Sequence, residues 1–246
     1  MNLIPDVRPA AGVNPTGYRG RVTKVILALR EAQGTSWLFE PELREALARV
    51  GTTAFQVNVD DVAVEDALRM AQAEPVVSVA SIWTDGDVRA ALDVMAAEAP
   101  EFDAYRVTER VRLDPRPVAN GERADIVAQI AFLRKPESMS REDYLAYWLL
   151  EHTAVAIRTQ NTVSYIQNIV EEVLAGSSPP VAAIVEEHFP MASLTDPHEL
   201  YGSGGDDAEL ERRMSLLIDS VVQFGAHRGL DLVPSSQYRW ELGARV

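Results

Sequence analysis

The chain contains no cysteine in its 246 residues, and this absence excludes disulfide bonds, thiolate metal ligands and thiol nucleophiles. It also lacks any apolar run long enough to span a membrane, and its first twenty residues contain no apolar run of signal-peptide length. From these absences we expect no membrane association, with the cytoplasm as the default location.

Positive charge is scarce as well, with 23 lysines and arginines against 37 aspartates and glutamates and a formal net charge of -14. A field of this sign repels the phosphates of nucleic acids and of anionic membranes, so we expect neither as a partner. The composition, 47% hydrophobic and 24% charged, is typical of a soluble globular protein with a substantial core.

Four histidines are present, and their spacing does not favour a metal site. They show neither an i, i+4 helical pair nor a His-Glu-x-x-His motif, and the chain has no thiolate ligands. His198 and His227 fall in a turn and at a helix end, where capping and the helix dipole account for them. We expect no metal and no other cofactor, which leaves His152 and His188 as candidates for chemistry.

The first half of the chain alternates between strands and helices after an arm at residues 1–20, which is rich in proline and glycine. Residues 21–114 have the order β-α-β-β-α-β, the spacing of a split βαβ unit. The expected elements are a strand at 21–30, a helix from Pro41 to Gly51, strands at 52–60 and 75–86, a helix capped by Asp87, and a strand at 104–113.

The same order returns after a linker at residues 115–123. In residues 124–246 the expected elements are a strand at 124–134, a helix from Ser140 to about Thr159, strands at 162–172 and 180–190, a helix at 206–229 and a strand at 235–242. Each half also places a Tyr-Arg pair after a proline at its last strand, Tyr105-Arg106 in the first and Tyr238-Arg239 in the second. Together these features predict a tandem duplication.

A sheet with helices on one face leaves its other apolar face uncovered. Two such sheets in one chain can cover each other and form a closed α+β barrel with its helices outside. We therefore predict an intramolecular pseudo-dimer rather than two independent domains, with a pocket between the two sheets. The glycine-rich stretch at 202–205 is interpreted as a flexible lid over the barrel mouth, because Asp206 and Asp207 behind it would repel a phosphate.

The helix that begins after Ser140 carries the clearest local pattern. Ser140 is followed three residues later by Asp143, a capping-box type of start with a short carboxylate. Tyr144, Trp148 and His152 then recur at every fourth residue and share one face of the helix. Such a stripe forms either core packing or the wall of a pocket.

The stretch around this helix resembles the EthD family, within the dimeric α+β barrel superfamily of ferredoxin-like folds. The residues that carry the resemblance are Arg134-Lys135-Pro136, Ser140, Tyr147-Trp148, His152 and Tyr165-Ile166-Gln167-Asn168. One departure is Thr153-Ala154-Val155, where the family usually has small-Pro-Leu, so the helix is expected to continue without a kink. The resemblance covers the second half, and the first half shares only the element order.

The resemblance implies two ferredoxin-like repeats and a small-molecule substrate. It favours a cofactor-independent acid–base enzyme, a lyase or dehydratase, cyclase or isomerase, that acts on a small hydrophobic oxygenated ring compound in the barrel interior. The alternatives are a non-catalytic binding barrel and a monooxygenase, either cofactor-free or haem-using. Because the first half offers no matching histidine, one site per chain is expected, and pairing into a homodimer stays open.

His152 is the leading catalytic candidate, since a neutral imidazole can take up a proton and return it elsewhere. In the strand at 162–172, Tyr165 and Gln167 share one face and Asn168 lies on the other. We expect Tyr165 and Gln167 to face the barrel interior, because Ile166 and Val170 suit packing against helices. Tyr165 would then donate a proton or a hydrogen bond, and Gln167 would orient the substrate.

A second strand offers a similar choice between its two faces. Glu187 and Phe189 alternate with His188, and alignment with the first half places Glu187 at Ser81 and Phe189 at Trp83. We favour Glu187 as a second acid–base group whose pKa is raised by burial, with His188 as the alternative. The expected substrate-binding residues are Trp148, Gln167, Gln129, Phe189, His188 and Tyr144.

Overall fold

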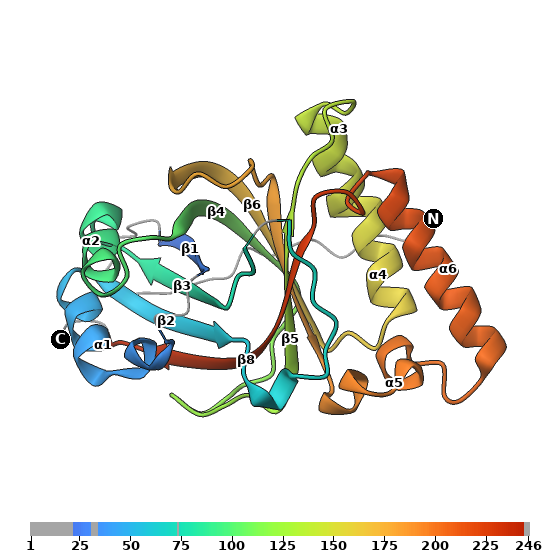
Figure 1. Cartoon of the computed structure of the whole chain (residues 1–246), viewed down its shortest axis with the longest axis horizontal. Coiled ribbons are helices and arrows are strands. Elements are labelled where there is room, and N and C mark those ends of the chain that lie inside the picture. Colours follow the sequence, from blue (N-terminus) through green and yellow to red (C-terminus); the bar gives the residue numbers. More distant parts are fainter. Residues whose placement is uncertain (1–21, 31–33, 73, 244–246) are drawn as a thin grey trace, which may run out of the picture.

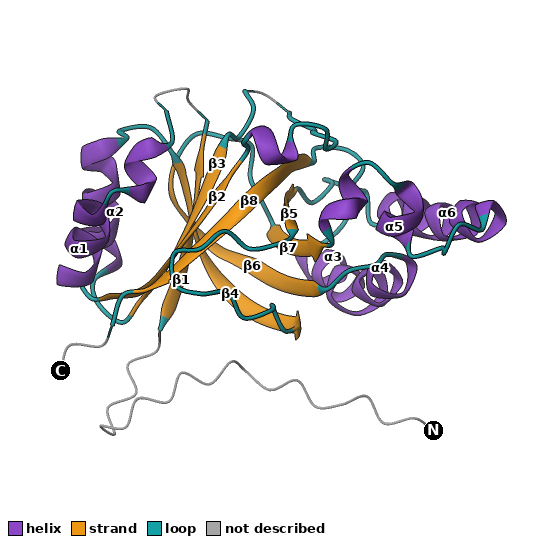
Figure 2. Cartoon of the chain, turned by 90° about the horizontal axis from the view of Figure 1, so that it is seen from below, coloured by secondary structure: helices purple, strands orange, loops and turns teal. Residues whose placement is uncertain are grey.

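The computed structural model describes residues 22–30, 34–72 and 74–243, so the predicted arm at 1–20 lies outside the described residues. Eight antiparallel strands form a closed barrel in the order β1-β3-β2-β8-β5-β7-β6-β4 (Figures 1 and 2). The strands are β1 (Thr23–Leu29), β2 (Thr52–Val59), β3 (Ser78–Thr84), β4 (Asp103–Leu113), β5 (Val127–Leu133), β6 (Ser164–Ala175), β7 (Ala183–Phe189) and β8 (Asp231–Glu241). The predicted α+β barrel is confirmed.

The helices lie outside the barrel in two groups on opposite sides (Figure 1). One group is α1 (Pro41–Arg49) and α2 (Val88–Glu98), and the other is α3 (Arg141–Ala146), η3 (Tyr147–His152), α4 (Thr153–Thr159), α5 (Pro197–Tyr201) and α6 (Asp207–Gln223). Short 3-10 turns are η1 (Ser36–Phe39), η2 (Val62–Val64) and η4 (Met191–Leu194). In the described part of the chain, no helix is long and apolar enough to cross a membrane.

The two halves of the chain contribute neighbouring sets of four strands to the barrel. The first half is ordered β4-β1-β3-β2 and the second β8-β5-β7-β6, and the sets meet at the pairs β2–β8 and β4–β6. Three of the four pairs of matching strands have equal lengths: β1 and β5 have seven residues, as do β3 and β7, while β4 and β8 have eleven. The fourth pair differs, with eight residues in β2 and twelve in β6. Residues of the three equal pairs can be compared position by position.

This register corrects two alignments made from the sequence. In the first half, Tyr105 on β4 pairs with Ile26 on β1. The counterpart of Ile26 in the second half is Ile130 on β5, and Ile130 pairs with Val233 on β8. The repeated Tyr-Arg pairs are therefore not counterparts, because β8 reaches its Tyr238 five residues later along the strand. Glu187 does not fall at Ser81 either: Ser81 pairs with Ile26 and Glu186 pairs with Ile130, so the sequence alignment of this strand is displaced by one residue.

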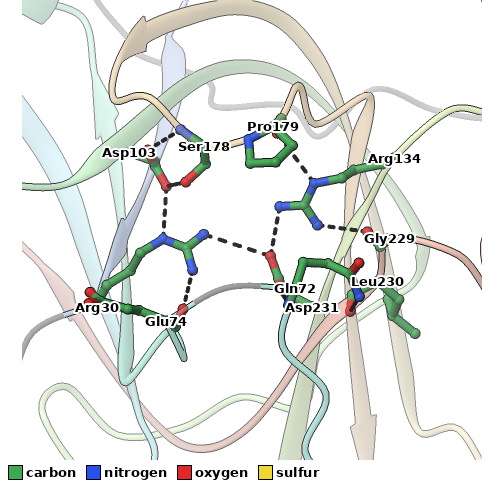
Figure 3. A network of polar contacts seen from close by, with 10 residues as sticks. All are labelled: Arg30, Gln72, Glu74, Asp103, Arg134, Ser178, Pro179, Gly229, Leu230 and Asp231. Atoms are coloured by element: carbon green, nitrogen blue, oxygen red, sulfur yellow. Dashed lines mark hydrogen bonds and ion pairs between the residues drawn. The ribbon is translucent and has the colours of Figure 1, made fainter.

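A better repeated signature lies at one end of the barrel, where four charged residues join the halves (Figure 3). Arg30 follows β1 and Arg134 follows β5 at matching positions, and Asp103 and Asp231 begin β4 and β8. Arg30 Nε donates to Asp103 Oδ2 at 3.1 Å, and Arg134 Nη2 donates to Asp231 Oδ2 at 2.8 Å. Arg30 Nη2 also lies 3.7 Å from Asp231 Oδ2, so the same arginine–aspartate pair occurs in each half and the pairs are linked.

Besides a small cluster of Ala124, Ile126 and Ala128, three larger apolar cores result from this arrangement. One lies between the two sheets and includes side chains from both halves, such as Ile26, Tyr105, Phe132 and Ile184. The second lies between the first sheet and α1 and α2, and the third lies between the second sheet and the helices α3 to α6. Both faces of each sheet are therefore buried.

The space between the sheets also holds a buried ion pair. Lys24 Nζ lies 2.7 Å from Glu186 Oε1 and 2.7 Å from Glu109 Oε2, and Gln56 and Asn168 donate to Glu186. Burial alone would raise the pKa of Glu186, but Lys24 and these hydrogen bonds hold it at about 2. The barrel interior is thus filled by apolar packing and paired charges at the level of these residues.

Candidate functional site

The helix predicted from Ser140 to Thr159 forms as expected, although its middle is not α-helical. Ser140 Oγ accepts from the backbone N–H of Asp143 at 3.0 Å, which confirms the predicted cap. From Tyr147 to His152 the backbone is a π-helix, and α4 continues from Thr153 without a break. Single π turns inside α-helices are frequent at functional sites because they shift the side chains that follow.

Thr153 stabilises this π turn and connects it to the sheet. Its Oγ1 donates to the carbonyl oxygen of Trp148 at 2.8 Å, and it accepts from Nε2 of Gln167 on β6 at 2.7 Å. Thr153 is the residue at which the sequence departs from the EthD pattern. The helix continues through Thr153, but with a π turn directly before it, and the Thr153 hydroxyl joins Trp148 to the strand beneath.

His152 lies between η3 and α6, so the expectation that it projects into the barrel interior is wrong. Its Nδ1 is 3.0 Å from Ser220 Oγ, and its ring lies 4.7 Å from the ring of Phe224. The helices pack on the outer face of the sheet, and the described core between the sheets contains residues of strands and of the loops next to them, but none of these helices. Burial lowers the pKa of His152 to about 4, so the imidazole is neutral at pH 7.

The predicted strand residues form a row beneath these helices. Tyr165 on β6 and Gln129 on β5 each pair directly with Glu187 on β7, which puts the three side chains next to one another on one face of the sheet. This is the outer face, since Tyr165 belongs to the core packed against the helices. The sequence therefore identified neighbours correctly but assigned them to the wrong face.

The interior face of β6 carries Ile166, Asn168 and Val170 instead. Val170 belongs to the core between the sheets, and Asn168 donates to Glu186 at 2.9 Å. Tyr165 and Gln167 were assigned to the interior face because both faces of β6 are buried, and an apolar residue such as Ile166 therefore suits either face. The interior face accepts an amide because the Lys24–Glu186 pair supplies a partner for it.

Several polar atoms in the layer between the second sheet and its helices are buried without a hydrogen-bond partner among the described residues. They are Tyr144 Oη, Trp148 Nε1, Tyr165 Oη, Gln167 Oε1 and Glu187 Oε1, and we call these five residues the helix-layer cluster. Buried polar groups are paired in the great majority of cases, so five unpaired ones in a single layer require an explanation. Donors and acceptors directed at a substrate would supply it.

The protonation states in the cluster are set mainly by burial. It raises the pKa of Glu187 to about 7. Burial, and after it the Glu187 carboxylate, raise the pKa of Tyr165. The side chains of Thr153 and Trp148 oppose that shift, because they lie near the Tyr165 hydroxyl, although neither forms a hydrogen bond of good geometry with it. Glu187 can therefore gain or lose a proton near neutral pH, whereas Tyr165 keeps its proton and remains a hydrogen-bond donor.

Tyr201 is a residue of this site that sequence reasoning missed. It is the last residue of α5, and both burial and the Glu187 carboxylate raise its pKa. The lid predicted at the glycine-rich stretch thus adjoins a segment near Glu187 rather than the barrel mouth. Asp206 accepts from two backbone N–H groups and so caps the start of α6.

The remaining predicted residues lie in different places. Phe189 is fully buried on the same face of β7 as Glu187, whereas His188 points to the barrel interior and lines a separate cavity. His198 binds Ser203 and Asp207 near α6, and His227 accepts from Arg228. In the ranges that the structure describes, no group of three histidine and acidic side chains could hold a metal ion.

A comparison with protein-family models finds no match, and a search of functionally curated proteins finds none either. Among solved structures, an anthrone oxidase-like protein superposes with a TM-score of 0.52 at 9% identity, over 92% of this chain and 94% of its own. A proposed monooxygenase from Lactobacillus acidophilus NCFM gives 0.47 at 10% identity, over 92% and 98%. One from Fusobacterium nucleatum gives 0.42 at 7%, over 89% and 91%.

These identities are far below the level at which function can be transferred, so the comparison concerns the fold alone. The anthrone oxidase-like protein and this chain share a fold over nearly the whole length of both chains. Membership of the EthD family stays a prediction. The fold of this chain is an eight-stranded α+β barrel.

Proposed function

We propose that this protein is a cofactor-independent acid–base enzyme acting on a small hydrophobic ring compound that carries an oxygen substituent. We place the reaction in the helix-layer cluster of the second half and not between the sheets. The observation that carries the proposal is the set of five buried, unpaired polar atoms in a layer that is otherwise apolar. That combination suits a mainly apolar ligand with a few hydrogen-bonding groups.

Glu187 is the proposed proton-transfer group. A general base works best when its pKa is near the operating pH, and burial brings the pKa of this carboxyl to about 7. Its Oε1 is buried without a partner in the described chain, so its lone pairs are available to a substrate proton. We propose that Glu187 removes a proton from a carbon next to a carbonyl group and returns it at another position.

Tyr165 and Trp148 are the proposed stabilisers of the negative charge that forms on the substrate oxygen. Both present a buried donor, Oη and Nε1, and the high pKa of Tyr165 keeps its phenol protonated. Neutral donors held in place before the reaction stabilise an oxyanion without further reorganisation. Gln167, fixed by its bond to Thr153, would orient the ring through its free Oε1.

His152 takes a different role in this proposal from the one predicted. A group with a pKa of about 4 is a weak base at pH 7, and its Nδ1 is engaged by Ser220. We assign it as a positioning residue that attaches η3 to α6 and thereby sets the direction of Trp148. The proton transfer is assigned to Glu187 instead.

An oxygenase is the second candidate, and it shares the first step. The solved structure with the TM-score above 0.5 is named for its likeness to an anthrone oxidase, and removal of a ring-activated proton precedes the reaction of such a carbanion with oxygen. The same base and the same donors would serve. Oxygen uptake separates this reaction from elimination, cyclisation or isomerisation.

We also propose that the barrel arose by duplication of a ferredoxin-like repeat and acts as a pseudo-dimer within one chain. Support comes from the equal lengths of three of the four strand pairs and from the arginine–aspartate pair that occurs in each half. Since the counterpart of the helix-layer cluster in the first half is apolar, the proposal gives one site per chain.

The test is proton exchange in deuterated water, with a panel of cyclic ketones and anthrones followed by mass spectrometry. We expect the protein to introduce deuterium at the carbon next to the carbonyl, and Glu187→Gln to slow this exchange by about 10²–10⁴-fold. Glu211→Gln, an exposed site on α6, is the matched control. Full activity of Glu187→Gln would contradict the assignment, and ligand recovered without deuterium from the unaltered protein would favour a binding barrel.

A further inference from the structure

A second pair of buried polar atoms without partners in the described chain lies on the opposite face of the same sheet. His188 Nε2 on β7 and Gln237 Oε1 on β8 belong to side chains that are 3% and 6% exposed. Both residues line a cavity of about 120 Å³ at one end of the barrel. The other lining residues are Arg116, Pro117, Val118, Ala124, Asp125, Ile126 and Val163.

At the matching positions of the first half, the corresponding polar groups are satisfied by a lysine side chain. Lys24 on β1 pairs with Trp83 on β3, and its Nζ lies 2.7 Å from Glu109 on β4 and 4.6 Å from the centre of the Trp83 ring. Trp83 Nε1 also donates to Glu109 at 3.1 Å. At this end of the first half, the ammonium of the chain's own lysine satisfies the polar groups.

In the second half the three counterparts are Ala128, His188 and Gln237. Ala128 pairs with His188 as Lys24 pairs with Trp83, and Gln237 stands seven residues into β8 as Glu109 does in β4. The short alanine side chain cannot reach the other two residues. The polar groups of His188 and Gln237 are therefore present without the internal cation that their counterparts have.

The cavity is held in shape by the backbone of the same two residues. The N–H of Ala124 donates to the carbonyl oxygen of Gln237 at 2.9 Å, and the N–H of Val163 donates to that of His188 at 2.8 Å. Residues 116–118, from the predicted linker at 115–123, and residues 124–126, from the start of the predicted strand at 124–134, close one side. The walls and the polar groups thus form one fixed unit, as a preformed site requires.

The two buried polar groups of the lining favour a neutral ligand, whereas the charged lining residues Arg116 and Asp125 are exposed. Burial lowers the pKa of His188, and the Lys24 charge adds to that effect. The Glu186 charge opposes it, as does Gln237, whose side chain lies near the imidazole without a hydrogen bond of good geometry. The ring is therefore uncharged near pH 7. Gln237 replaces the carboxylate of the first half with an amide oxygen, which accepts only. Imidazole Nε2 either donates or accepts, and Pro117, Val118 and Ile126 contribute apolar surface.

We propose that this cavity is a binding site for a small neutral molecule that carries a hydrogen-bond donor and acceptor side by side, such as a carboxamide or an alcohol. The ligand N–H or O–H donates to Gln237 Oε1, and its oxygen faces His188 Nε2. A volume of about 120 Å³ accommodates a molecule of several non-hydrogen atoms, well beyond a single water. The site is separate from the helix-layer cluster, because His188 and Glu187 point to opposite faces of β7.

The test compares acetamide with acetone, which has the same shape and an acceptor but no donor. We follow the imidazole resonances of the four histidines by nitrogen-15 NMR during a titration of the full chain. Acetamide is expected to shift the His188 signals in a saturable way and to leave those of His152, His198 and His227 in place, while acetone binds more weakly. Equal responses to the two compounds, or equal shifts of all four histidines, would overturn the proposal.

A variant then locates the acceptor. Gln237→Leu removes the amide oxygen at similar size and should weaken acetamide binding roughly three- to tenfold, the effect of one lost hydrogen bond, so that the preference over acetone disappears. Gln223→Leu, at an exposed position at the end of α6, is the matched control and should bind as before. If Gln237→Leu still preferred acetamide to acetone, Gln237 would be excluded as the recognition group. The titration of the unaltered chain tests the binding site itself and does not depend on this variant.

Discussion

The two helix-covered faces of the barrel use the same positions for opposite purposes. On the first sheet, Ile82 pairs with Val25 on one side and with Phe55 on the other, and all three belong to an apolar core. The counterpart row on the second sheet is Gln129, Glu187 and Tyr165. The backbone is shared, but one row is ordinary core and the other contains an amide, a carboxyl and a phenol.

This difference shows that the polar row is not a requirement of the fold. An apolar row at the same depth closes the first half of the barrel, so the second half could have been built in the same way. Burying polar groups without partners costs free energy of folding, and in natural proteins such departures from good packing are concentrated at functional sites. The comparison is therefore evidence for a site in the second half that does not depend on any relative.

The largest expected effect comes from moving the carboxyl to the apolar face. Ile82→Glu puts an unpartnered acid into the first layer and should lower the free energy of unfolding by roughly 4 kcal/mol or more. Glu187→Ile, the reverse exchange, should leave it unchanged or raise it by up to about 2 kcal/mol, because a buried unpaired oxygen is removed.

Urea unfolding of the two variants and the unaltered chain measures both values at one pH. If Glu187→Ile were as destabilising as Ile82→Glu, Glu187 would be a structural residue. The contrast between the two rows would then lose its functional meaning. Proton exchange on the ketone panel, measured on the same samples, should be lost in Glu187→Ile and kept in Ile82→Glu below its unfolding transition.

The element order, the closed barrel and the capped helix could be read from the sequence because each depends on local pattern. Strand alternation, turn residues and the Ser140–Asp143 start all act within a few residues. The same local patterns identified Gln129, Tyr165 and Glu187 as polar residues in otherwise apolar strands. Those three turned out to be direct neighbours in one row.

Which face of each strand looks inward could not be read, for a physical reason. Alternation distinguishes faces only when one is exposed to water, and both faces of β6 and β7 are buried. The interior also holds the Lys24–Glu186 pair, so polarity does not mark the outer face. Tyr201 was missed because its proximity to Glu187 joins elements that no local pattern connects.

A smaller effect on stability is expected from pH, because Glu187 and His152 change the stability in opposite directions as the pH changes. The pKa of Glu187 is raised from 4.5 to about 7, so its contribution to stability is complete below pH 4.5 and is lost as the pH rises through 7. The pKa of His152 is lowered from 6.5 to about 4, so its contribution is complete above pH 6.5 and is lost as the pH falls towards 4.

Two variants separate these contributions. Relative to the unaltered chain, Glu187→Gln should gain stability as the pH rises from 4.5 to 7, by on the order of 1–2 kcal/mol since the side chain is only partly buried. His152→Gln should gain relative stability as the pH falls from 6.5 to 4. Unfolding curves at steps between pH 4 and 8 test both trends, and a pH-independent difference for Glu187→Gln would show that its pKa is not raised.

The smallest expected effect concerns how the first long helix of each half begins. Ser140 Oγ accepts from the N–H of Asp143 at 3.0 Å and also lies 2.7 Å from the Asp143 carboxylate, whereas Glu40, ahead of α1, makes no side-chain cap bond in the described chain. Ser140→Ala should therefore cost about 1 kcal/mol of unfolding free energy, and Glu40→Ala close to nothing.

Because the cap begins the helix that carries Trp148 and His152, Ser140→Ala should also broaden the His152 signals in the histidine NMR spectrum. An equal loss of stability in both variants would mean that helix starts contribute alike in the two halves, and the second would then owe its order to packing on Phe224 and Ser220 rather than to its cap.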